Sequence, residues 1–511
     1  MKHLIFLILL LPSLLYAQKY DYTWQMGYST FKNSPRPQYG FKLDFNSQTA
    51  KLDTFLRNHN YAETIVSMSD RNGKFLFSTN GCKVFNKNLD VMENGDSLNP
   101  STWNDYVCNA QGGEIISQGA LSLPLPDSND STFLLLHTQI DDIGNDKIEL
   151  LPLNLYTTKI NMLSNNGLGK VFDKNKLLIS DVLDGGNISA VKHDNGKDWW
   201  VLVRKFISNT YYSIKVTSKG VDTVFSQSLG NQTNLYGQGG GQTSFSSNGK
   251  NYAYYTHLDD LMLYDFDRNS GKLSNFRSIR IPRIPKDGNI FTGLSFSPNS
   301  RFIYIFAAYE IFQVDLQESD TTKRVEKIAD HDSINAPFAY PIYAQLAPDC
   351  RIYFVSVNGI QTFGYIRHPD RKGTNCQVVQ GGIKLPFSVA TKGGLPNNPN
   401  YRLGTTPTYP CDSTIRFAVS TKETTLPQAH YILYPNPTHS ILNIDYEADT
   451  GELYADITIV DLVGRVLTKE KKEIIATPLS IDVSNLPAGV YNCVFSVKGK
   501  LPTAQRFVIM R

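Results

Sequence analysis

A short phrase recurs along the middle of the chain, and its spacing restricts the fold more than any other feature. In each copy an apolar and a small residue lead into a turn rich in Asp, Asn, Ser or Gly, followed by a basic residue and a strand. The clear copies place the basic residue at Lys250, Arg301 and Arg351, and two looser copies place it at Lys74 and Lys197. From Lys197 onward the basic residues are 53, 51 and 50 residues apart, and a weaker copy at residues 126–131 lies between Lys74 and Lys197. Repeats of about 40–50 residues are typical of β-propeller blades.

The chemistry of the phrase supports the same interpretation. Asp, Asn and Gly favour tight hairpin turns, and the apolar strands that follow carry packing side chains on both faces. One sheet cannot bury both of its faces, but a ring of sheets can. We therefore predict an all-β chain containing a β-propeller of six or seven blades, with seven favoured. Six copies are visible, and the segment after Tyr20 joined to residues 415–419 would complete a seventh. The alternative is an array of β-sandwiches with a coincidental spacing.

The composition agrees with a β-rich fold and argues against nucleic acid as a partner. The chain has 511 residues with 28 Tyr, 27 Phe, 36 Gly and 25 Pro, a set that favours strands and turns. Its formal net charge is only +3, and its Lys and Arg residues are scattered rather than clustered in a basic run.

The first residues have the pattern of a signal peptide. Lys2 and His3 precede an apolar run from Leu4 to Leu15, and Ala17 supplies a small residue at the expected cleavage point. A membrane-spanning helix needs roughly 20 apolar residues, and this run is shorter. We predict a signal peptide over residues 1–17 and a mature chain that starts at Gln18. The alternative is a short membrane anchor.

Several motifs stand in order along the last 80 residues. They comprise Tyr434, Pro435, Asn436 and Pro437, then Asp461, Gly464 and Arg465, then Gly489, Val490 and Tyr491. Together they resemble the type A C-terminal sorting domain of type IX secretion substrates. The resemblance implies a small immunoglobulin-like β-sandwich over residues 432–511. Residues 421–431, which carry little apolar surface, are the expected linker, and residues 18–420 are the expected propeller.

The resemblance also implies a route and a set of partners. Tails of this family are recognised by the outer-membrane translocon and removed by a sorting peptidase, and the cargo is attached to surface lipopolysaccharide or released. We therefore expect a secreted or surface-attached protein that first reaches the periplasm. A permanent adhesion domain of immunoglobulin shape is the alternative, because fold alone does not decide function.

Phrases within the propeller region resemble a secreted WD40/YVTN-like propeller family that accompanies such tails. They include Thr79–Asn86, Ser117–Ala120, Gly394–Asn397 and Asn400–Gly404. This resemblance implies no established activity and transfers no catalytic residue. We expect a binding protein whose partner is another protein or a glycan. The alternatives are a propeller hydrolase of the lactonase or glycosidase type and a structural component of the cell surface or gliding apparatus.

Two histidines near acidic pairs are the candidate ligand-binding residues. His137 precedes Asp141 and Asp142, and His257 precedes Asp259 and Asp260; each set follows the main strand of its repeat. At the mouth of a propeller channel such groups would suit Ca²⁺ or a sugar. Polar strand ends and turn caps are the alternative. Residues 141–146 offer alternate oxygen ligands for Ca²⁺ but lack the distal Glu of a calcium loop, so we predict no resident cofactor.

Six cysteines, at positions 82, 108, 350, 376, 411 and 493, permit disulfides in an exported chain. Cys82 and Cys108 are 26 residues apart, as are Cys350 and Cys376, and these two pairs are the predicted disulfides. Six cysteines allow 15 pairings, so the spacing is a weak guide. The absence of a Cys-x-x-Cys motif and of zinc-like Cys/His spacing argues against a zinc site.

Overall fold

Two compact units make up the chain, residues 1–418 and residues 419–511. The computed structural model describes residues 18–27, 39–55, 57–142, 150–185, 187–232, 240–282, 291–334, 336, 338–356, 360–386, 393–406, 409–417, 431–446, 454–462, 465–474, 478–497 and 503–511. The predicted signal peptide and residues 421–430 of the predicted linker lie outside these ranges. No helix in the described ranges is long and apolar enough to cross a membrane.

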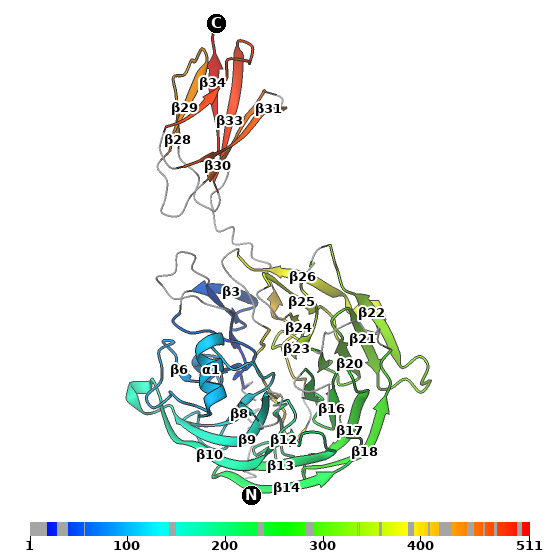
Figure 1. Cartoon of the computed structure of the whole chain (residues 1–511). Coiled ribbons are helices and arrows are strands. Elements are labelled where there is room, and N and C mark those ends of the chain that lie inside the picture. Colours follow the sequence, from blue (N-terminus) through cyan, green and yellow to red (C-terminus); the bar gives the residue numbers. More distant parts are fainter. Residues whose placement is uncertain are drawn as a thin grey trace, which may run out of the picture. The chain divides into compact units, whose positions relative to one another are not determined.

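The first unit is a β-propeller. Its described strands form seven sheets, six with four strands and one with three, and Figure 1 shows them arranged around a central axis with the later strands of each sheet at the rim. We number the blades 1 to 7 in chain order. Blade 1 is β1-β2-β3-β27, blade 2 is β4-β5-β6, and blades 3 to 7 each contain four consecutive strands from β7 to β26. The prediction of a propeller, with seven blades favoured, is confirmed.

The first strands lie next to the axis and the fourth strands form the rim. The first strands are β1 (Thr23–Met26), β4 (Val66–Ser69), β7 (Ala120–Pro124), β11 (Ser189–Lys192), β15 (Gln242–Phe245), β19 (Gly293–Phe296) and β23 (Tyr343–Leu346). The second strands are β2 (Gly40–Asp44), β5 (Phe75–Thr79), β8 (Thr132–Asp142), β12 (Trp199–Arg204), β16 (Asn251–Tyr255), β20 (Phe302–Phe306) and β24 (Ile352–Val355). The third strands are β3 (Thr49–Phe55), β6 (Val84–Asn86), β9 (Leu150–Asn161), β13 (Thr210–Thr217), β17 (Leu261–Asp267), β21 (Glu310–Asp315) and β25 (Thr362–Ile366). The fourth strands are β27 (Arg416–Phe417), β10 (Lys170–Val182), β14 (Gly220–Ser228), β18 (Lys272–Ile279), β22 (Val325–Asp330) and β26 (Val378–Lys384).

The recurring phrase forms the turn between the first and second strands of blades 2 to 7. In the five copies that carry a basic residue, the residue before it has a positive φ: Gly73 (92°), Gly196 (70°), Gly249 (71°), Ser300 (62°) and Cys350 (66°). Its amide closes the turn on the carbonyl three residues earlier, as in Gly249 N to Ser246 O at 2.8 Å. Glycine is the natural residue for this left-handed conformation. The turn chemistry read from the sequence therefore corresponds to one hairpin in each of blades 2 to 7.

The two ends of the unit meet in blade 1. β27 pairs in parallel with β3, with Arg416 opposite Thr49 and Phe417 opposite Ala50. The N-terminal part of the chain thus supplies three strands of this blade and residues 416–417 supply the fourth. The closure of the ring by both ends, expected from the sequence, is present.

Packing between neighbouring blades supplies the core. Ala253 and Leu263 of blade 5 pack against Leu294 and Ile305 of blade 6 in one buried cluster, and another cluster joins blades 6 and 7. Because both faces of these sheets pack against neighbouring blades, every residue of β20 and β21 is buried, and β20 is apolar throughout. At roughly 25 cal/mol per Å² of apolar surface, these inter-blade layers are the main favourable contribution to folding.

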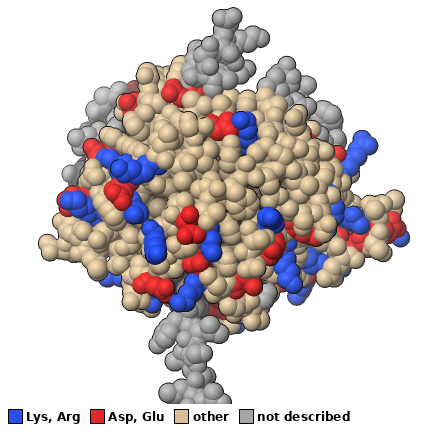
Figure 2. Space-filling model, turned by 90° about the horizontal axis from the view of Figure 1, so that it is seen from below, with Lys and Arg blue, Asp and Glu red and all other residues tan. Residues whose placement is uncertain are grey.

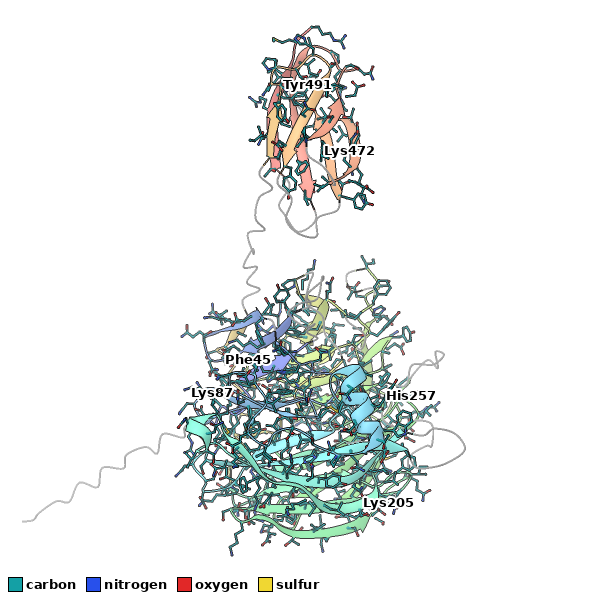
Figure 3. All side chains as sticks on the ribbon, turned by 60° about the vertical axis from the view of Figure 1, so that its left-hand side comes forward. Phe45, Lys87, Lys205, His257, Lys472 and Tyr491 are labelled. Carbon is teal, nitrogen blue, oxygen red and sulfur yellow. A yellow bond between two sulfur atoms is a disulfide. The ribbon has the colours of Figure 1, made fainter. Side chains whose placement is uncertain are left out.

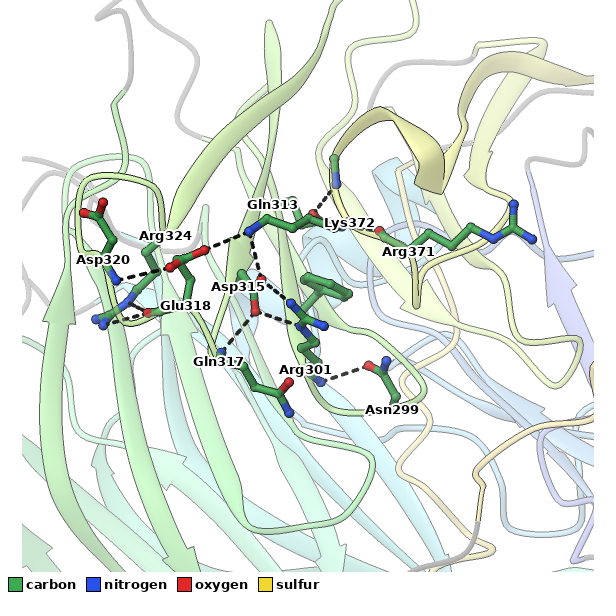
Figure 4. Close-up of polar contacts among 12 residues, drawn as sticks. Asn299, Arg301, Gln313, Asp315, Gln317, Glu318, Asp320, Arg324, Arg371 and Lys372 are labelled. Atoms are coloured by element: carbon green, nitrogen blue, oxygen red, sulfur yellow. Dashed lines mark hydrogen bonds and ion pairs between the residues drawn. The ribbon is translucent and has the colours of Figure 1, made fainter.

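Polar contacts reinforce the packing of blade 6 on blade 7 (Figure 4). Arg301, the basic residue of its turn phrase, donates two hydrogen bonds to Asp315, at 2.9 and 2.7 Å. Lys372 of blade 7 reaches Glu318 at 2.9 Å and Asp315 at 3.4 Å. Bidentate Arg–carboxylate pairs hold a fixed geometry, so Arg301 fixes the turn between β19 and β20 against the end of β21.

One α-helix interrupts the described strands, and one disulfide tethers it. The helix α1 (Thr102–Gln111) starts at Ser101, whose hydroxyl accepts from the Asn104 amide, and stops at Gly112 in the left-handed conformation. Two short 3₁₀ turns, η1 (Asn165–Gly167) and η3 (Gly373–Cys376), complete the helical structure described in this unit. Cys108 on α1 is bonded to Cys82 beside β6, as predicted from the sequence.

The second predicted disulfide is wrong. Cys350 is bonded to Cys411, with their Cα atoms 5.2 Å apart. The Asp412 amide donates to Pro348 O at 2.7 Å, which brings Cys411 beside the turn that carries Cys350. Cys376 is instead a buried thiol in the layer between blades 6 and 7, and burial raises its pKa to about 11. Equal sequence spacing could not show which chain segment returns to the Cys350 turn.

The second unit is a β-sandwich. One sheet contains β28 (Tyr431–Tyr434), β29 (Ile441–Tyr446) and β32 (Leu479–Asp482). The other contains β31 (Val466–Glu473), β30 (Tyr454–Val460), β33 (Gly489–Val497) and β34 (Thr503–Ile509). Buried and exposed residues alternate along β28 and β30, as expected when one face of each sheet forms the core.

Candidate functional site

Residues 394–404, here called the plug, occupy the central channel of the propeller. Leu395, Asn397, Asn398, Tyr401 and Leu403 are each at most 9% exposed, although the segment has neither helix nor strand structure. Its polar groups bond to the first strands of several blades. In the sequence, the plug is visible only as two family phrases, Gly394–Asn397 and Asn400–Gly404. Its side chains determine how much space is left along the propeller axis.

Asn397 anchors the plug at the end of the channel where the first strands of blades 3 and 4 begin. Its Nδ2 donates to Ala120 O at 3.0 Å and to Ile188 O at 2.8 Å. Its backbone N–H donates to Ile65 O at 3.1 Å. Carbonyls on the axial edge of a first strand have no neighbouring strand to pair with, and an unpaired buried carbonyl is costly. One amide side chain therefore satisfies acceptors on two blades.

Tyr401 and Arg402 anchor the plug at the other end. The Tyr401 hydroxyl donates to Ser122 O at 3.0 Å, and its ring packs against Tyr20 and Trp199 with centroids 5.4 and 5.7 Å away. Arg402 forms a bidentate pair with Asp21 at 2.6 and 2.7 Å. Burial lowers the pKa of Arg402, but the charge and hydrogen bonds of Asp21 outweigh that effect and raise its pKa overall. The plug is thus tied to the N-terminal segment of the propeller.

Two glutamines cross the channel. Gln118 belongs to the family phrase at residues 117–120, whereas Gln242 was not singled out from the sequence. The Gln242 Nε2 donates to Ala344 O at 2.7 Å, and its Oε1 accepts from the Leu294 and Ala344 amides, both at 3.1 Å. The Gln118 Oε1 accepts from the Thr243 amide at 2.9 Å. In the sequence, each glutamine is a polar residue at or just before the start of a first strand. Many strands begin with such a residue, so the sequence does not distinguish these two.

A small chamber remains beside the plug. It has a volume of about 70 Å³ and is lined by hydroxyl and amide groups that include Ser189, Ser244, Ser295, Gln345 and Asn398. Both polar atoms of the Asn398 side chain and the Ser189 hydroxyl are buried without a protein hydrogen-bond partner. Buried polar groups of this kind are usually satisfied by ordered water. The chamber therefore has the chemistry of a small polar site whose lining also includes the ion pair of Asp21 and Arg402.

His137 lies inside blade 3 rather than at the channel mouth. It is fully buried; its Nδ1 is hydrogen-bonded to Asn99 Oδ1, and its Nε2 lies 2.8 Å from Thr158 Oγ1. Burial lowers its pKa to about 3, which keeps the ring neutral. Asp141 and Asp142 end β8, opposite Leu151 and Leu150. The Asp142 side chain and residues 143–146 of the candidate calcium loop lie outside the described residues.

His257, Asp259 and Asp260 lie in the loop that follows β16 in blade 5, at the edge of the propeller in Figure 3. The Thr256 hydroxyl donates to Asp259 Oδ2 at 2.9 Å. Blade 4 separates this loop from the His137 blade, so the structure does not bring the two histidines together. Within the described ranges, no group of three or more His, Cys, Asp or Glu residues is arranged to hold a metal ion.

Glu114 is a buried acid that the sequence did not reveal. It is fully buried after α1, and neither carboxyl oxygen has a hydrogen-bond partner. Burial, only partly offset by polar contacts with Thr64 and Ile140, raises its pKa well above the usual value. A carboxyl group with a raised pKa is a site candidate only with a cavity and a partner, and Glu114 shows neither among the described residues.

We expect Glu114→Gln to stabilise the propeller at neutral pH. Because the folded pKa lies above the unfolded one, the stability that Glu114 contributes is fully present below about pH 4.3 and is lost as pH rises toward the folded pKa. The advantage of the Gln variant should therefore grow by about 1.4 kcal/mol per pH unit in that window. Urea unfolding at pH 5, 6 and 7, followed by tryptophan fluorescence, measures it. Glu93→Gln, at an exposed ion pair with Lys170, is the control; parallel pH profiles for both variants would contradict the assignment.

The motif residues of the second unit stabilise its turns. Asn436 accepts from the Val508 amide at 2.9 Å and donates to Arg506 O at 3.1 Å, which ties the Tyr434–Pro437 turn to β34. Asp461 accepts from Arg465 Nε at 3.1 Å and from its amide at 2.9 Å. The Tyr491 hydroxyl, beside Gly489 and the exposed Val490, donates to Pro487 O at 2.8 Å. Gly464 lies outside the described residues.

Residues 432–510 match the family model described as "Secretion system C-terminal sorting domain". This tail is a type IX sorting domain. The matched residues include almost the whole β-sandwich, so the resemblance inferred from the turn motifs is confirmed. The type IX sorting domain directs the protein to the cell surface or the surrounding medium and is recognised by the type IX machinery. No curated protein matches the chain.

Solved structures similar to the propeller share little sequence with it. The Cps50 (Swd1) β-propeller domain of Myceliophteria thermophila is 8% identical, with 64% of this chain and 92% of that chain covered and a TM-score of 0.33. AztD of Citrobacter koseri is 11% identical, with 73% and 88% covered and a TM-score of 0.32. A putative 6-phosphogluconolactonase of Bacteroides fragilis is 14% identical, with 66% and 99% covered and a TM-score of 0.29. At these scores the likenesses carry no weight in the proposals below.

Proposed function

We propose that the propeller is the binding module of this type IX secreted protein and that it recognises a surface glycan or protein through one end of the ring. In blades 3 to 7 the strands alternate in direction, so the loops between second and third strands and those between blades lie at the same end. We call this end the loop face. It includes the loop of His257 and the connection from β22 to β23.

The observation that carries the proposal is a pair of exposed apolar side chains on the loop face. Ile334 is 88% exposed and Phe338 is 71% exposed, whereas isolated exposed apolar residues of smaller size need no explanation. Among the described residues between them and before them, the Ala336 amide donates to Asp332 O at 3.0 Å, and His331 Nε2 lies 2.9 Å from Ala336 O. Apolar side chains that gather on a surface mark interaction sites.

The plug supports binding over catalysis. Residues 394–404 fill the axis, where a propeller enzyme would hold its substrate, and leave a chamber of about 70 Å³. That volume suits a few water molecules and not a drug-sized substrate. On this proposal His257, Asp259 and Asp260 add polar contacts at the loop face, and His137, buried inside blade 3, supports the sheet.

Charge does not favour one partner class. In the view of Figure 2, Lys and Arg side chains are interspersed with Asp and Glu, and uncharged surface separates them. A mixed surface of this kind gives little long-range steering. Shape and apolar contact at the loop face would then decide specificity.

The test uses the mature full-length chain purified after export. It is applied to a glycan array and to purified surface proteins of the producing cell, and Kd is measured for each ligand. We expect Ile334→Ser/Phe338→Ser to weaken binding at least tenfold, His257→Ala/Asp259→Ala to weaken it less, and Asp222→Ala on β14 to leave it unchanged. Ligand recovered by mass spectrometry should be unaltered. Ligand cleavage by the wild type, or no binding to either class, would overturn the proposal.

A further inference from the structure

An open groove separates blade 1 from blade 2. It has a volume of about 560 Å³, within the range of small-molecule sites. Gln25 of β1 and Lys42 of β2 lie on its floor, and Phe55 of β3 borders it. Blade 2 contributes Lys74 and Phe75 from the start of β5, and Lys87 from the turn after β6. Figure 1 shows β3 and β6 on neighbouring blades.

The groove exists because blade 2 is narrow. Its described sheet contains three strands, whereas its neighbours contain four. The face of blade 1 that turns toward it is therefore incompletely covered, and in β3 one residue of seven, Ala50, is buried. In β21 of blade 6, by contrast, all six residues are buried. The missing cover leaves space where other blade pairs have a packed apolar layer.

Positive charge without an acidic partner marks one wall. Lys42 is already paired, with Asp53 at 3.3 Å and Asp44 at 3.9 Å. Lys74 and Lys87 have no acidic group within 4.0 Å among the described residues. Lys87 is labelled in Figure 3 at the side of the propeller. Asp44 of β2 also lines the groove and is partly neutralised by Lys42, so the two ammonium groups on the blade 2 wall remain to attract an anionic ligand.

Other residues that line the groove would be matched by uncharged groups of a ligand. Gln25 is 3% exposed, and its Oε1 has no hydrogen-bond partner in the structure. A buried acceptor of this kind costs free energy unless a donor reaches it. Phe55 and Phe75 are half-buried and offer flat apolar surface to the groove. The ligand must therefore combine an anionic group, a hydrogen-bond donor and an apolar face.

We propose that the groove between blades 1 and 2 binds an acidic oligosaccharide. A uronic acid unit presents a carboxylate to Lys74 and Lys87, a hydroxyl donor to Gln25 Oε1, and the C–H face of its ring to Phe55 or Phe75. An acidic peptide supplies carboxylates, but it offers the donor and the apolar face on separate residues. The groove belongs to blades 1 and 2, whereas the loop-face residues belong to blade 5 and the connection between blades 6 and 7, so this inference stands apart from the function proposed above.

The inference is tested by titrating the mature full-length chain with tetragalacturonate, tetramannuronate, maltotetraose and tetraglutamate in a calorimeter. We expect at least one acidic sugar to bind more tightly than neutral maltotetraose, and added NaCl to weaken it because screening acts on exposed charges. Lys74→Gln and Lys87→Gln should each raise Kd about two- to fivefold, and together about tenfold. Phe55→Ala should raise it further in a chain whose urea unfolding is unchanged.

Lys250→Gln is the matched control, since Lys250 holds the same position in the turn of blade 5 as Lys74 does in blade 2, and its Kd should equal that of the wild type. Three results would overturn the inference: binding of neither acidic sugar, equal affinity of the double Lys variant and the wild type, or tighter binding of tetraglutamate. A loop-face variant, Ile334→Ser/Phe338→Ser, separates the two sites. Its loss of binding in the earlier test with retained sugar affinity here would show that each proposal stands or falls by itself.

Discussion

Arg402→Met is expected to destabilise the propeller by roughly 3–5 kcal/mol, because it leaves the Asp21 carboxylate buried without its partner. The side chains of Arg402 and Asp21 are 11% and 4% exposed, and Arg402 also donates to Pro410 O and Gln18 O. All four tryptophans lie at positions 24, 103, 199 and 200. Tryptophan fluorescence during urea unfolding therefore reports the propeller and not the sorting domain.

A matched variant distinguishes the buried pair from an ordinary surface pair. Arg277→Met breaks the pair with Asp265, whose side chains are 43% and 36% exposed, and it should cost at most about 1 kcal/mol. In a double-mutant cycle, Asp21→Asn with Arg402→Met should cost less than the two single changes together. Equal small losses for Arg402→Met and Arg277→Met would mean that the pair does not hold the plug.

Phe495→Ala is expected to abolish most export by unfolding the sorting domain. Phe495 is fully buried, and its ring packs against Tyr431 and Tyr446 with centroids 5.0 and 4.8 Å away. Truncation of a buried Phe costs roughly 3–5 kcal/mol, a large share of the about 5–15 kcal/mol that stabilises a typical domain. The amount of protein released or displayed by the native host, measured by immunoblot of cell fractions, should fall severalfold.

Val466→Ala provides the comparison for this experiment. Val466 is 58% exposed at the start of β31, so its truncation should leave both the fold and export near wild-type levels. Thermal unfolding of each purified chain, followed by differential scanning calorimetry, shows whether the sandwich has melted separately from the propeller. Normal export of a Phe495→Ala chain with an unfolded tail would mean that the machinery reads a linear motif rather than the folded sandwich.

Local chemistry explains which parts of the fold could be predicted. The Asn-Gly-Lys turn at residues 248–250 and its counterparts specify a hairpin through the conformational needs of a few adjacent residues, so their number and spacing reported the blades. Two of the sorting motifs are local in the same way, since Asp461 bonds to Arg465 and Tyr491 bonds to Pro487, each four residues away. The pairing of Cys82 with Cys108 also joins segments of one neighbourhood.

The features that escaped prediction depend on contacts between distant parts of the chain. The plug has no periodicity, and its amides are meaningful only beside the carbonyls of Ala120 and Ile188, more than 200 residues earlier. The pairing of Cys350 with Cys411 follows from the path of the same returning segment. His137 looked like a ligand beside Asp141, yet the structure places it between strands, where its partners are Asn99 and Thr158.

The meeting of both ends in blade 1 has a consequence for the order of folding. Arg402 and Asp21 are separated by 381 residues, so the contact that secures the plug closes a loop almost as long as the propeller. Long-range closure slows folding, because chain entropy is lost before the contact is gained. Blade 1 can be completed only after residue 417 has been exported. The linker and the sorting domain come after this residue in the chain. The propeller can therefore finish folding only at about the time when the sorting domain follows it. An exported chain that lacks β27 would keep unpaired strand edges, which favour aggregation.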